Sequence, residues 1–147
     1  MIFICCFVNR CKPDVHSFTT LMNTYVNASN MLKAENVLKR MKLEEVEPNI
    51  VTYGTLIKGY ASRGDVDRMV RKYDEMRHQH IEVSQTLFIL MLRAFGKYVG
   101  LDRAMSWFKE MNGTGFQPDG RAHKILLELS MMKGRRDEVE EFLDSLT

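Results

Sequence analysis

The sequence predicts an all-α protein, an α-solenoid of stacked helical hairpins with a 35-residue period. The prolines at positions 13, 48 and 118 are separated by 35 and 70 residues. A shift of 35 residues also aligns aromatic and apolar positions with one another. The aligned columns include Phe18, Tyr53 and Phe88; Leu21, Leu56, Met91 and Leu126; Tyr25, Tyr60 and Phe95; and Met41, Met76 and Met111. Self-similarity at this length is typical of repeats that bury their apolar faces by stacking.

Within each period the pattern predicts two helices. In residues 50–84 the first apolar stripe has the i, i+3, i+4, i+7 spacing of a buried helix face, formed by Tyr53, Leu56, Ile57 and Tyr60. A break at Arg63-Gly64-Asp65 follows, and Asp65 is the predicted N-cap of a second helix. The predicted units are repeat 1 (15–49), repeat 2 (50–84), repeat 3 (85–119) and an incomplete terminal repeat (120–147). Residues 1–14 resemble the tail of a preceding repeat, because Lys12-Pro13-Asp14 repeats the closing motif.

Composition narrows the class of protein. The chain has 147 residues, 45% hydrophobic and 27% charged, which suits one folded domain and disfavours disorder or a membrane bundle. Cys5, Cys6 and Cys11 form an odd cluster, so we expect unpaired thiols rather than a disulfide framework or a zinc site. The apolar run at 2–8 is too short to span a bilayer, which needs about 20 residues. No membrane partner is expected, and no transit peptide or secretory signal is legible.

Catalytic motifs are missing from the sequence. It contains no Gly-rich phosphate loop ending in Lys-Ser/Thr, and no nucleophile with a base and an orienting group. His78-Gln79-His80 lacks further ligands at metal-binding spacing. We therefore expect no enzyme activity, no cofactor, no metal and no small-molecule substrate.

Several motifs recur in register across residues 12–147. Repeat 2 reads Val51-Thr52-Tyr53-Gly54-Thr55-Leu56-Ile57-Lys58-Gly59-Tyr60, then Gly64-Asp65-Val66-Asp67 and Glu75-Met76, and Pro118-Asp119 closes repeat 3. These motifs resemble the pentatricopeptide repeat family of plant organelles. The resemblance implies single-stranded RNA binding in chloroplasts or mitochondria, at about one base per repeat. It also implies a role in RNA processing, splicing, stability or translation.

The resemblance further implies which residues would read RNA. In that family the fifth and last residues of a repeat choose the base, and the second packs against its face. The implied base-reading pairs are Thr19 with Asn49, Gly54 with Ser84, and Ile89 with Asp119; the implied base-packing residues are His16, Val51, Thr86 and Arg121. The first pair resembles a combination that prefers adenine, and the other two are unusual. Gly54 has no side chain to read a base edge, and Ile89 can form no side-chain hydrogen bond.

The last residue of each repeat has a second interpretation. Asp14, Asn49, Ser84 and Asp119 each precede a predicted helix and are favoured N-cap types. Helix capping would explain these residues without any RNA. The two roles are not exclusive.

Charge distribution gives an independent indication of an anionic partner. The net charge is only +2, yet the first fourteen residues of the four units hold seven Lys or Arg against one acid. The rest of the chain then holds fourteen against eighteen, a net charge of −4. Clustered positive charge attracts phosphates. Lys58, Arg93 and Lys97 share helix faces with Gly54 and Ile89 at four-residue spacing, and they are the predicted phosphate contacts.

Two alternatives remain open at this stage. Ile89 and the two unusual pairs favour a protein–protein interaction scaffold, since solenoid grooves also accept peptides. The abrupt start at Lys12-Pro13-Asp14 favours a truncated, non-functional fragment of a longer repeat protein. Three complete repeats would cover about three or four nucleotides, so a homodimer or a protein partner would have to add affinity.

Overall fold

The computed structural model describes residues 14–146, which form eight α-helices and no β-strand. The all-α prediction is confirmed for this part of the chain. Cys5, Cys6, Cys11 and almost all of the segment interpreted as a repeat tail lie outside it. The helices are α2 (Val15–Asn27), α3 (Met31–Leu43), α4 (Ile50–Ser62), α5 (Val66–His78), α6 (Gln85–Tyr98), α7 (Leu101–Gly113), α8 (Gly120–Lys133) and α9 (Arg136–Ser145).

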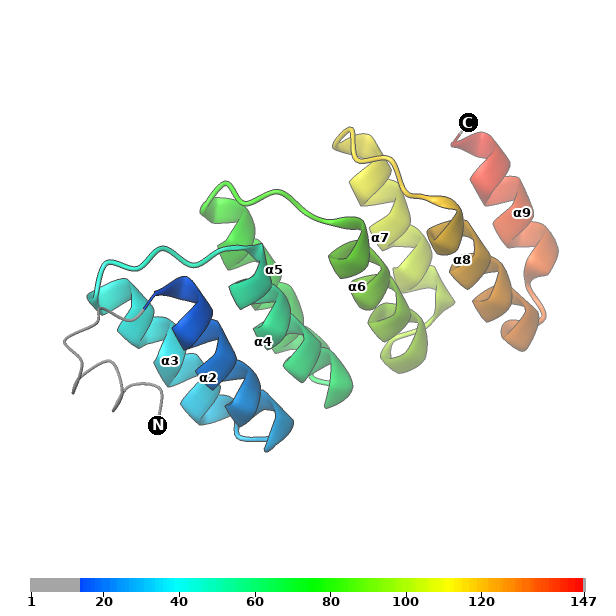
Figure 1. The fold of residues 1–147 in the computed structure, drawn as a ribbon. Helices are drawn as coiled ribbons and strands as arrows, with labels where there is room; N and C mark the ends of the chain where they lie inside the picture. The colour runs from blue at the N-terminus through cyan, green and yellow to red at the C-terminus, as the bar shows by residue number, and fades with distance from the viewer. Residues whose placement is uncertain (1–13, 147) are drawn as a thin grey trace. The chain divides into compact units, whose positions relative to one another are not determined.

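The helices pack as hairpins within two compact units (Figure 1). The N-terminal unit, Met1–Glu82, holds the hairpins α2–α3 and α4–α5, and α4 packs against both α2 and α3. The C-terminal unit, Val83–Thr147, holds α6–α7 and α8–α9, and α8 packs against both α6 and α7. In each unit the first helix of the second hairpin therefore covers the hairpin before it. This contact buries apolar faces that one hairpin could not bury alone.

Side-chain caps fix where the first helices begin. Asp14 Oδ1 accepts a hydrogen bond from the Ser17 amide at 2.8 Å, and Asn49, Ser84 and Asp119 cap α4, α6 and α8 in the same manner. The capping interpretation of the unit-end residues is thus confirmed. Asp65 is the N-cap of α5, as predicted, and accepts from the Arg68 amide at 3.2 Å.

The aligned columns of the sequence supply many of the buried core side chains. Phe18, Met41, Tyr53, Leu56 and Met76 are completely buried in the N-terminal unit. Their counterparts in the C-terminal unit include Phe88, Met91, Met111 and Leu126, each at most 2% exposed. The 35-residue period therefore reflects core packing as well as chain connectivity.

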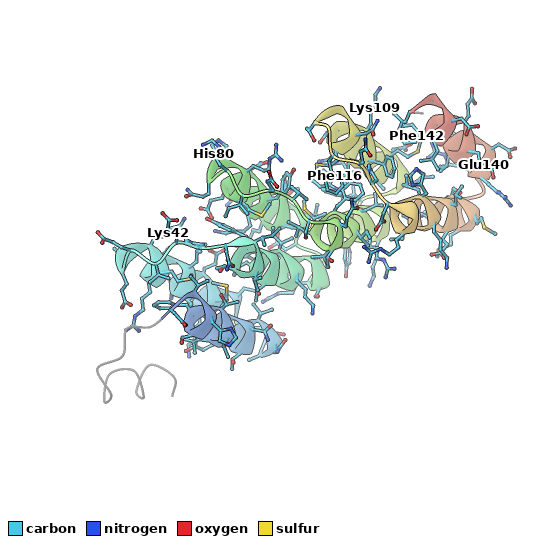
Figure 2. The ribbon with its side chains drawn as sticks, turned by 45° about the horizontal axis from the view of Figure 1, so that its top comes forward. Lys42, His80, Lys109, Phe116, Glu140 and Phe142 are labelled. Atoms are coloured by element: carbon cyan, nitrogen blue, oxygen red, sulfur yellow. The ribbon has the colours of Figure 1, made fainter. Side chains whose placement is uncertain are left out.

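An aromatic cluster occupies the core of the C-terminal unit. The Phe88 ring lies 5.0 Å from Phe116 and 5.8 Å from Phe108, measured between ring centroids. Phe108 in turn contacts Phe142 at 6.3 Å and His123 at 5.3 Å. Figure 2 labels Phe116, from the loop before α8, and Phe142, from α9. Offset and edge-on aromatic pairs of this kind add stability beyond the area they bury.

Among residues 14–146 no helix has the length and apolar character needed to cross a bilayer.

Candidate nucleic-acid interface

The predicted reading pair of repeat 1 is joined through a third residue. The Thr19 hydroxyl donates to the Val15 carbonyl at 2.7 Å and lies 3.2 Å from the Thr52 hydroxyl oxygen. The Thr52 hydroxyl is 3.1 Å from Asn49 Oδ1, to which it donates. Each hydroxyl has one proton, and both protons are donated elsewhere, so Thr19 and Thr52 meet in a polar contact while Thr52 is hydrogen-bonded to Asn49.

Thr52 also orients the Asn49 amide group. Asn49 Oδ1 accepts from the Thr52 amide at 3.1 Å, and the Asn49 amide donates back to the Thr52 hydroxyl at 3.3 Å. This reciprocal pair is a capping box. Because both Thr52 donors face Oδ1, the Nδ2 group of the exposed Asn49 is left available to a ligand. The sequence analysis missed Thr52, although its Asn-x-x-Thr spacing was a signal for this arrangement.

The Thr19 side chain is less accessible than a simple reading role requires. Thr19 is 9% exposed and Thr52 is completely buried, whereas Asn49 is exposed. The Thr19 proton goes to the Val15 carbonyl, so the hydroxyl presents an acceptor rather than a donor. Repeat 1 thus offers one outward donor group, Asn49 Nδ2, beside one nearly covered acceptor.

In repeat 3 the predicted reading residue Asp119 is held by a predicted base-packing residue. Asp119 Oδ1 accepts from the amides of Arg121 and Ala122, at 3.1 and 3.3 Å. Its Oδ2 accepts from the Arg121 guanidinium, at 2.9 Å from Nε and 2.8 Å from Nη2. The hydrogen bond from Arg121 lowers the pKa of Asp119 below its usual range. The carboxylate is therefore ionised and fully occupied, while its predicted partner Ile89 is half-buried.

Gln85 is a second residue that the sequence analysis missed. Its Nε2 donates to the Gln117 carbonyl at 2.7 Å, and its Oε1 accepts from the Asp119 amide at 3.3 Å. The first residue of α6 thereby fixes the loop that leads into α8. Only the fold brings these residues together, since they are more than thirty positions apart in the chain.

In the remaining predicted pair, Gly54 lies on α4 and has open space around it. A Cβ atom at Gly54 would meet nothing within 4 Å. Ser84 belongs to the C-terminal unit, where its hydroxyl accepts from the Leu87 amide at 3.2 Å and caps α6. The base-packing candidates His16, Val51, Thr86 and Arg121 are all exposed at the second position of their helices. Val51 is 59% exposed and offers an apolar surface there.

The three predicted phosphate contacts carry charges that no neighbouring acid neutralises. Lys58, Arg93 and Lys97 are exposed, and among residues 14–146 none of them forms an ion pair. The Lys97 ammonium lies 5.1 Å from the centroid of the Tyr98 ring. Other cations of the first helices are engaged: Arg63 donates to the Ser29 carbonyl at 2.9 Å, and Lys124 lies 3.9 Å from Glu128.

The second helices carry charges of both signs. Many of their cations face carboxylates, and the pairs include Arg40–Glu44, Lys42–Glu75, Lys72–Glu35, Arg103–Glu110 and Arg136–Glu140. Unpaired cations occur on the second helices as well, whereas α4 and α6 differ from them in containing no acidic residue. No group of three or more His, Cys, Asp or Glu side chains that could hold a metal ion occurs in the part of the chain that the structure describes.

Repeated helical hairpins with caps at each start and cations on the first helices define a helical-repeat protein of the α-solenoid class. Sequence profiles of the "PPR repeat family" match residues 13–62 and 48–97, and a "PPR repeat" profile matches residues 87–116. The chain belongs to the pentatricopeptide repeat family, which confirms the resemblance drawn from the sequence.

Named relatives of the chain include chloroplastic and mitochondrial plant proteins. The chain is 25% identical over 120 residues to a chloroplastic pentatricopeptide repeat-containing protein of Arabidopsis thaliana, covering 79% of this chain and 15% of the relative. It is 23% identical over 138 residues to a mitochondrial one from the same plant, covering 94% of this chain and 33% of the relative. The chain thus spans a third or less of the length of these relatives.

Solved structures confirm the α-solenoid fold. The crystal structure of maize PPR10 matches with a TM-score of 0.82 and 22% identity, covering 97% of this chain and 20% of that protein. PPR10 in complex with an 18-nt psaJ RNA element matches with a TM-score of 0.80 and 22% identity, covering 98% of this chain and 21% of PPR10.

Proposed function

We propose that this chain is a single-stranded RNA-binding adaptor of chloroplast or mitochondrial RNA metabolism. It would hold RNA along the first helices of its repeats and act by protecting, unfolding or presenting that RNA. Family membership, the organellar relatives and the RNA complex of PPR10 support this proposal. The chain carries no catalytic step in this scheme.

The observation that carries the proposal is the unneutralised positive charge of α4 and α6. Lys58, Arg93 and Lys97 keep their charges free of acidic neighbours within the described chain, although the protein is nearly neutral overall. A purely solvated surface normally mixes both signs. Three cations beside the predicted reading positions suit a phosphate backbone, whose binding releases counterions and weakens with salt.

We assign the base preference of the chain mainly to repeat 1. The Nδ2 group of Asn49 is a donor, and the Thr19 oxygen is an acceptor once its proton goes to the Val15 carbonyl. Adenine presents a complementary acceptor and amino donor on one edge. Because Thr19 is only 9% exposed, Asn49 makes the outer contact and Thr19 acts at the margin of the site. Val51 and His16 would then pack against base faces.

The pairs Gly54–Ser84 and Ile89–Asp119 contribute little base discrimination in this proposal. Gly54 supplies space but no polar group, and Ile89 supplies only apolar contact. Arg121 could stack its guanidinium plane on a base if it leaves Asp119, since arginine planes stack on unpaired bases. Three complete repeats cover about three or four nucleotides, so a second copy or a protein partner adds the affinity needed in an organelle.

Fluorescence anisotropy with short 5′-hydroxyl RNAs at two salt concentrations tests the proposal. We expect salt-sensitive binding to single strands, weaker binding to duplex RNA, and a preference for adenine. The slope of log K against log salt is negative, and each phosphate contact on a single strand contributes roughly 0.7 to its magnitude. The triple variant Lys58→Ala, Arg93→Ala, Lys97→Ala should therefore reduce that magnitude by about two.

A matched control removes three exposed cations from second helices, with Lys33→Ala, Arg77→Ala and Lys109→Ala in one chain. These residues lie on α3, α5 and α7 and change the net charge by the same amount. The control should keep most of the salt slope. An equal loss of slope in both variants would mean that net charge alone drives binding. No binding to any strand at low salt would reject the RNA proposal and favour a protein scaffold.

A further inference from the structure

A cavity of about 360 Å³ lies between the second helices of the N-terminal unit. Lys39 of α3 lines it together with Arg68, Arg71 and Lys72 of α5, and Met31 and Leu32 add apolar surface. Its volume is at the lower end of the range for small-ligand sites, about 300–1,000 Å³. The residues proposed above for base reading and phosphate contact do not line it. Outside the first helices the chain has a net negative charge, so four cations around one cavity are a local exception.

The carboxylate in this cavity is already neutralised from within the protein. Glu35 Oε2 lies 2.8 Å from the Lys72 ammonium, and Glu35 Oε1 accepts a hydrogen bond from the Tyr60 hydroxyl. The Glu35 and Lys72 side chains are only 19% and 14% exposed. Burial, with the hydrogen bond to Glu35, raises the pKa of Tyr60, so the phenol keeps its proton and remains a donor. Glu35 therefore does not offset the other cations.

Two cations of the cavity are left unpaired within the described residues. Lys39 and Arg71 are exposed, and neither forms an ion pair within residues 14–146, whereas Arg68 lies 3.5 Å from Asp65. Unneutralised like charges around one cavity disfavour the empty state and favour a bound anion. In a folded protein such an arrangement stabilises an anionic ligand more than an isolated surface lysine does.

The cationic arrangement occurs in one place along the repeats. At the Lys72 position the other units have Val37, Trp107 and Phe142, so a core column becomes charged only in repeat 2. At the Arg71 position they have Asn36, Ser106 and Glu141. The cavity is therefore not a by-product of the repeat consensus. It depends on residues that only repeats 1 and 2 bring together.

We propose that this cavity binds a phosphate ester, carried by a free nucleotide or by an RNA strand. Arg71 can hold two phosphate oxygens through its planar guanidinium, and Lys39 adds a mobile point charge. Leu32, which is 74% exposed, contacts the sugar or base attached to the phosphate. The site lies on second helices and does not depend on base reading by the first helices, so either proposal can fail alone.

The test is a titration of the full ¹⁵N-labelled chain at low salt, followed by amide chemical shifts. The probes are inorganic phosphate, adenosine 5′-monophosphate, and short RNAs with a 5′-phosphate or a 5′-hydroxyl. We expect saturable shifts at 31–39 and 66–72, with the nucleotide binding more tightly than phosphate. The double variant Lys39→Gln, Arg71→Gln should weaken nucleotide binding about tenfold or more, as loss of two charge-assisted contacts predicts.

The matched control is Arg77→Gln with Lys109→Gln, which removes two exposed cations from α5 and α7 (Lys109 is labelled in Figure 2). Its nucleotide affinity should stay within about twofold of the parent. An equal loss in both double variants, or no saturable shift with any phosphate probe, overturns the proposal. Tighter binding of 5′-phosphate than of 5′-hydroxyl RNA identifies the strand end as the source. Binding of the mononucleotide alone identifies a free nucleotide.

Discussion

Replacement of Thr52 by valine should separate the geometry of the Asn49 amide from the presence of Asn49. Valine has nearly the same shape as threonine, so the completely buried site remains filled while the hydroxyl is lost. The hydroxyl makes contacts at 3.1, 3.3 and 3.2 Å with Asn49 Oδ1, the Asn49 amide and Thr19 Oγ1. The Thr52 amide still donates to Asn49 Oδ1 in the variant, so α4 keeps its cap.

The magnitude follows from these contacts. The two hydrogen bonds to Asn49 are worth about 0.5–1.5 kcal/mol each, so their loss totals roughly 1–3 kcal/mol. The added buried methyl group returns about 0.8 kcal/mol. We therefore expect Thr52→Val to lower the free energy of unfolding by about 0.2–2 kcal/mol. The matched variant Thr52→Ser keeps the hydroxyl and loses only the methyl group, at a cost of about 1 kcal/mol.

The assay combines urea unfolding, followed by far-UV circular dichroism, with RNA anisotropy. The single tryptophan lies on α7 in the C-terminal unit, so its fluorescence is the wrong probe for this change. Thr52→Val should lose most of the preference for adenine over the other bases, and Thr52→Ser should keep it. The salt slope should stay the same in both. If both variants keep the adenine preference, Thr52 does not orient the reading group and the network is structural only.

Four further outcomes test particular side chains. Asn49→Asp keeps an N-cap oxygen but removes the amide donor. The free energy of unfolding should therefore stay within about 0.5 kcal/mol of the parent, while the preference for adenine measured by anisotropy falls. An unchanged preference would mean that Asn49 only caps the helix. Tyr60→Phe should lower the free energy of unfolding in urea by about 1.5–3 kcal/mol, because it breaks a hydrogen bond to the Glu35 carboxylate. Tyr53→Phe should be neutral or stabilising, since the Tyr53 hydroxyl is buried with no hydrogen-bond partner within residues 14–146. Burial, with nearby carboxylates, raises the pKa of Tyr53 to about 12. Since an unfolded tyrosine titrates near pH 10, the contribution of the protonated Tyr53 to stability is present below about pH 10 and is lost as the pH rises towards 12. Tyr53→Phe should reduce this loss of stability at alkaline pH, and an unchanged dependence of stability on pH would reject the assignment to Tyr53. Gly54→Ala should stabilise the protein by up to about 1 kcal/mol, because the added Cβ atom has no atom within 4 Å. Gly96→Ala should stabilise it less or destabilise it, because the added Cβ atom would lie 2.4 Å from a leucine side chain of α8. Calorimetry of the two variants compares these effects.

The sequence predicts the helices well because their signals are local. Aligned apolar columns, breaks such as the one at Gly64, and N-cap types at Asn49 or Asp119 all act within a few residues of their own helix. The all-α class, the family and the four capping positions could therefore be predicted from the residues alone. The division into repeats and the RNA-reading pairs stay predictions.

Other features were out of reach because they depend on partners brought together by folding. Gln85 contacts the loop before α8, and Lys72 meets Glu35 across two helices. Counting Lys and Arg along the sequence gives equal weight to cations that form ion pairs in the fold and cations that do not. Arg121 is occupied by Asp119, whereas Arg93 faces no acid in the described chain. Pairing, and not the total charge, decides which cations can meet a phosphate.

Capping and base reading can coexist at the end of a repeat only when they use different atoms. Asn49 satisfies this condition, because Oδ1 caps α4 and Nδ2 remains outward. Asp119 does not, since Oδ1 caps α8 and Oδ2 is bound by Arg121. Ser84 accepts the cap hydrogen bond of α6 and keeps its O–H as a donor, but its predicted partner Gly54 supplies no polar group. Base preference should therefore be concentrated in repeat 1, where one side chain has both an atom for the fold and an atom for the ligand.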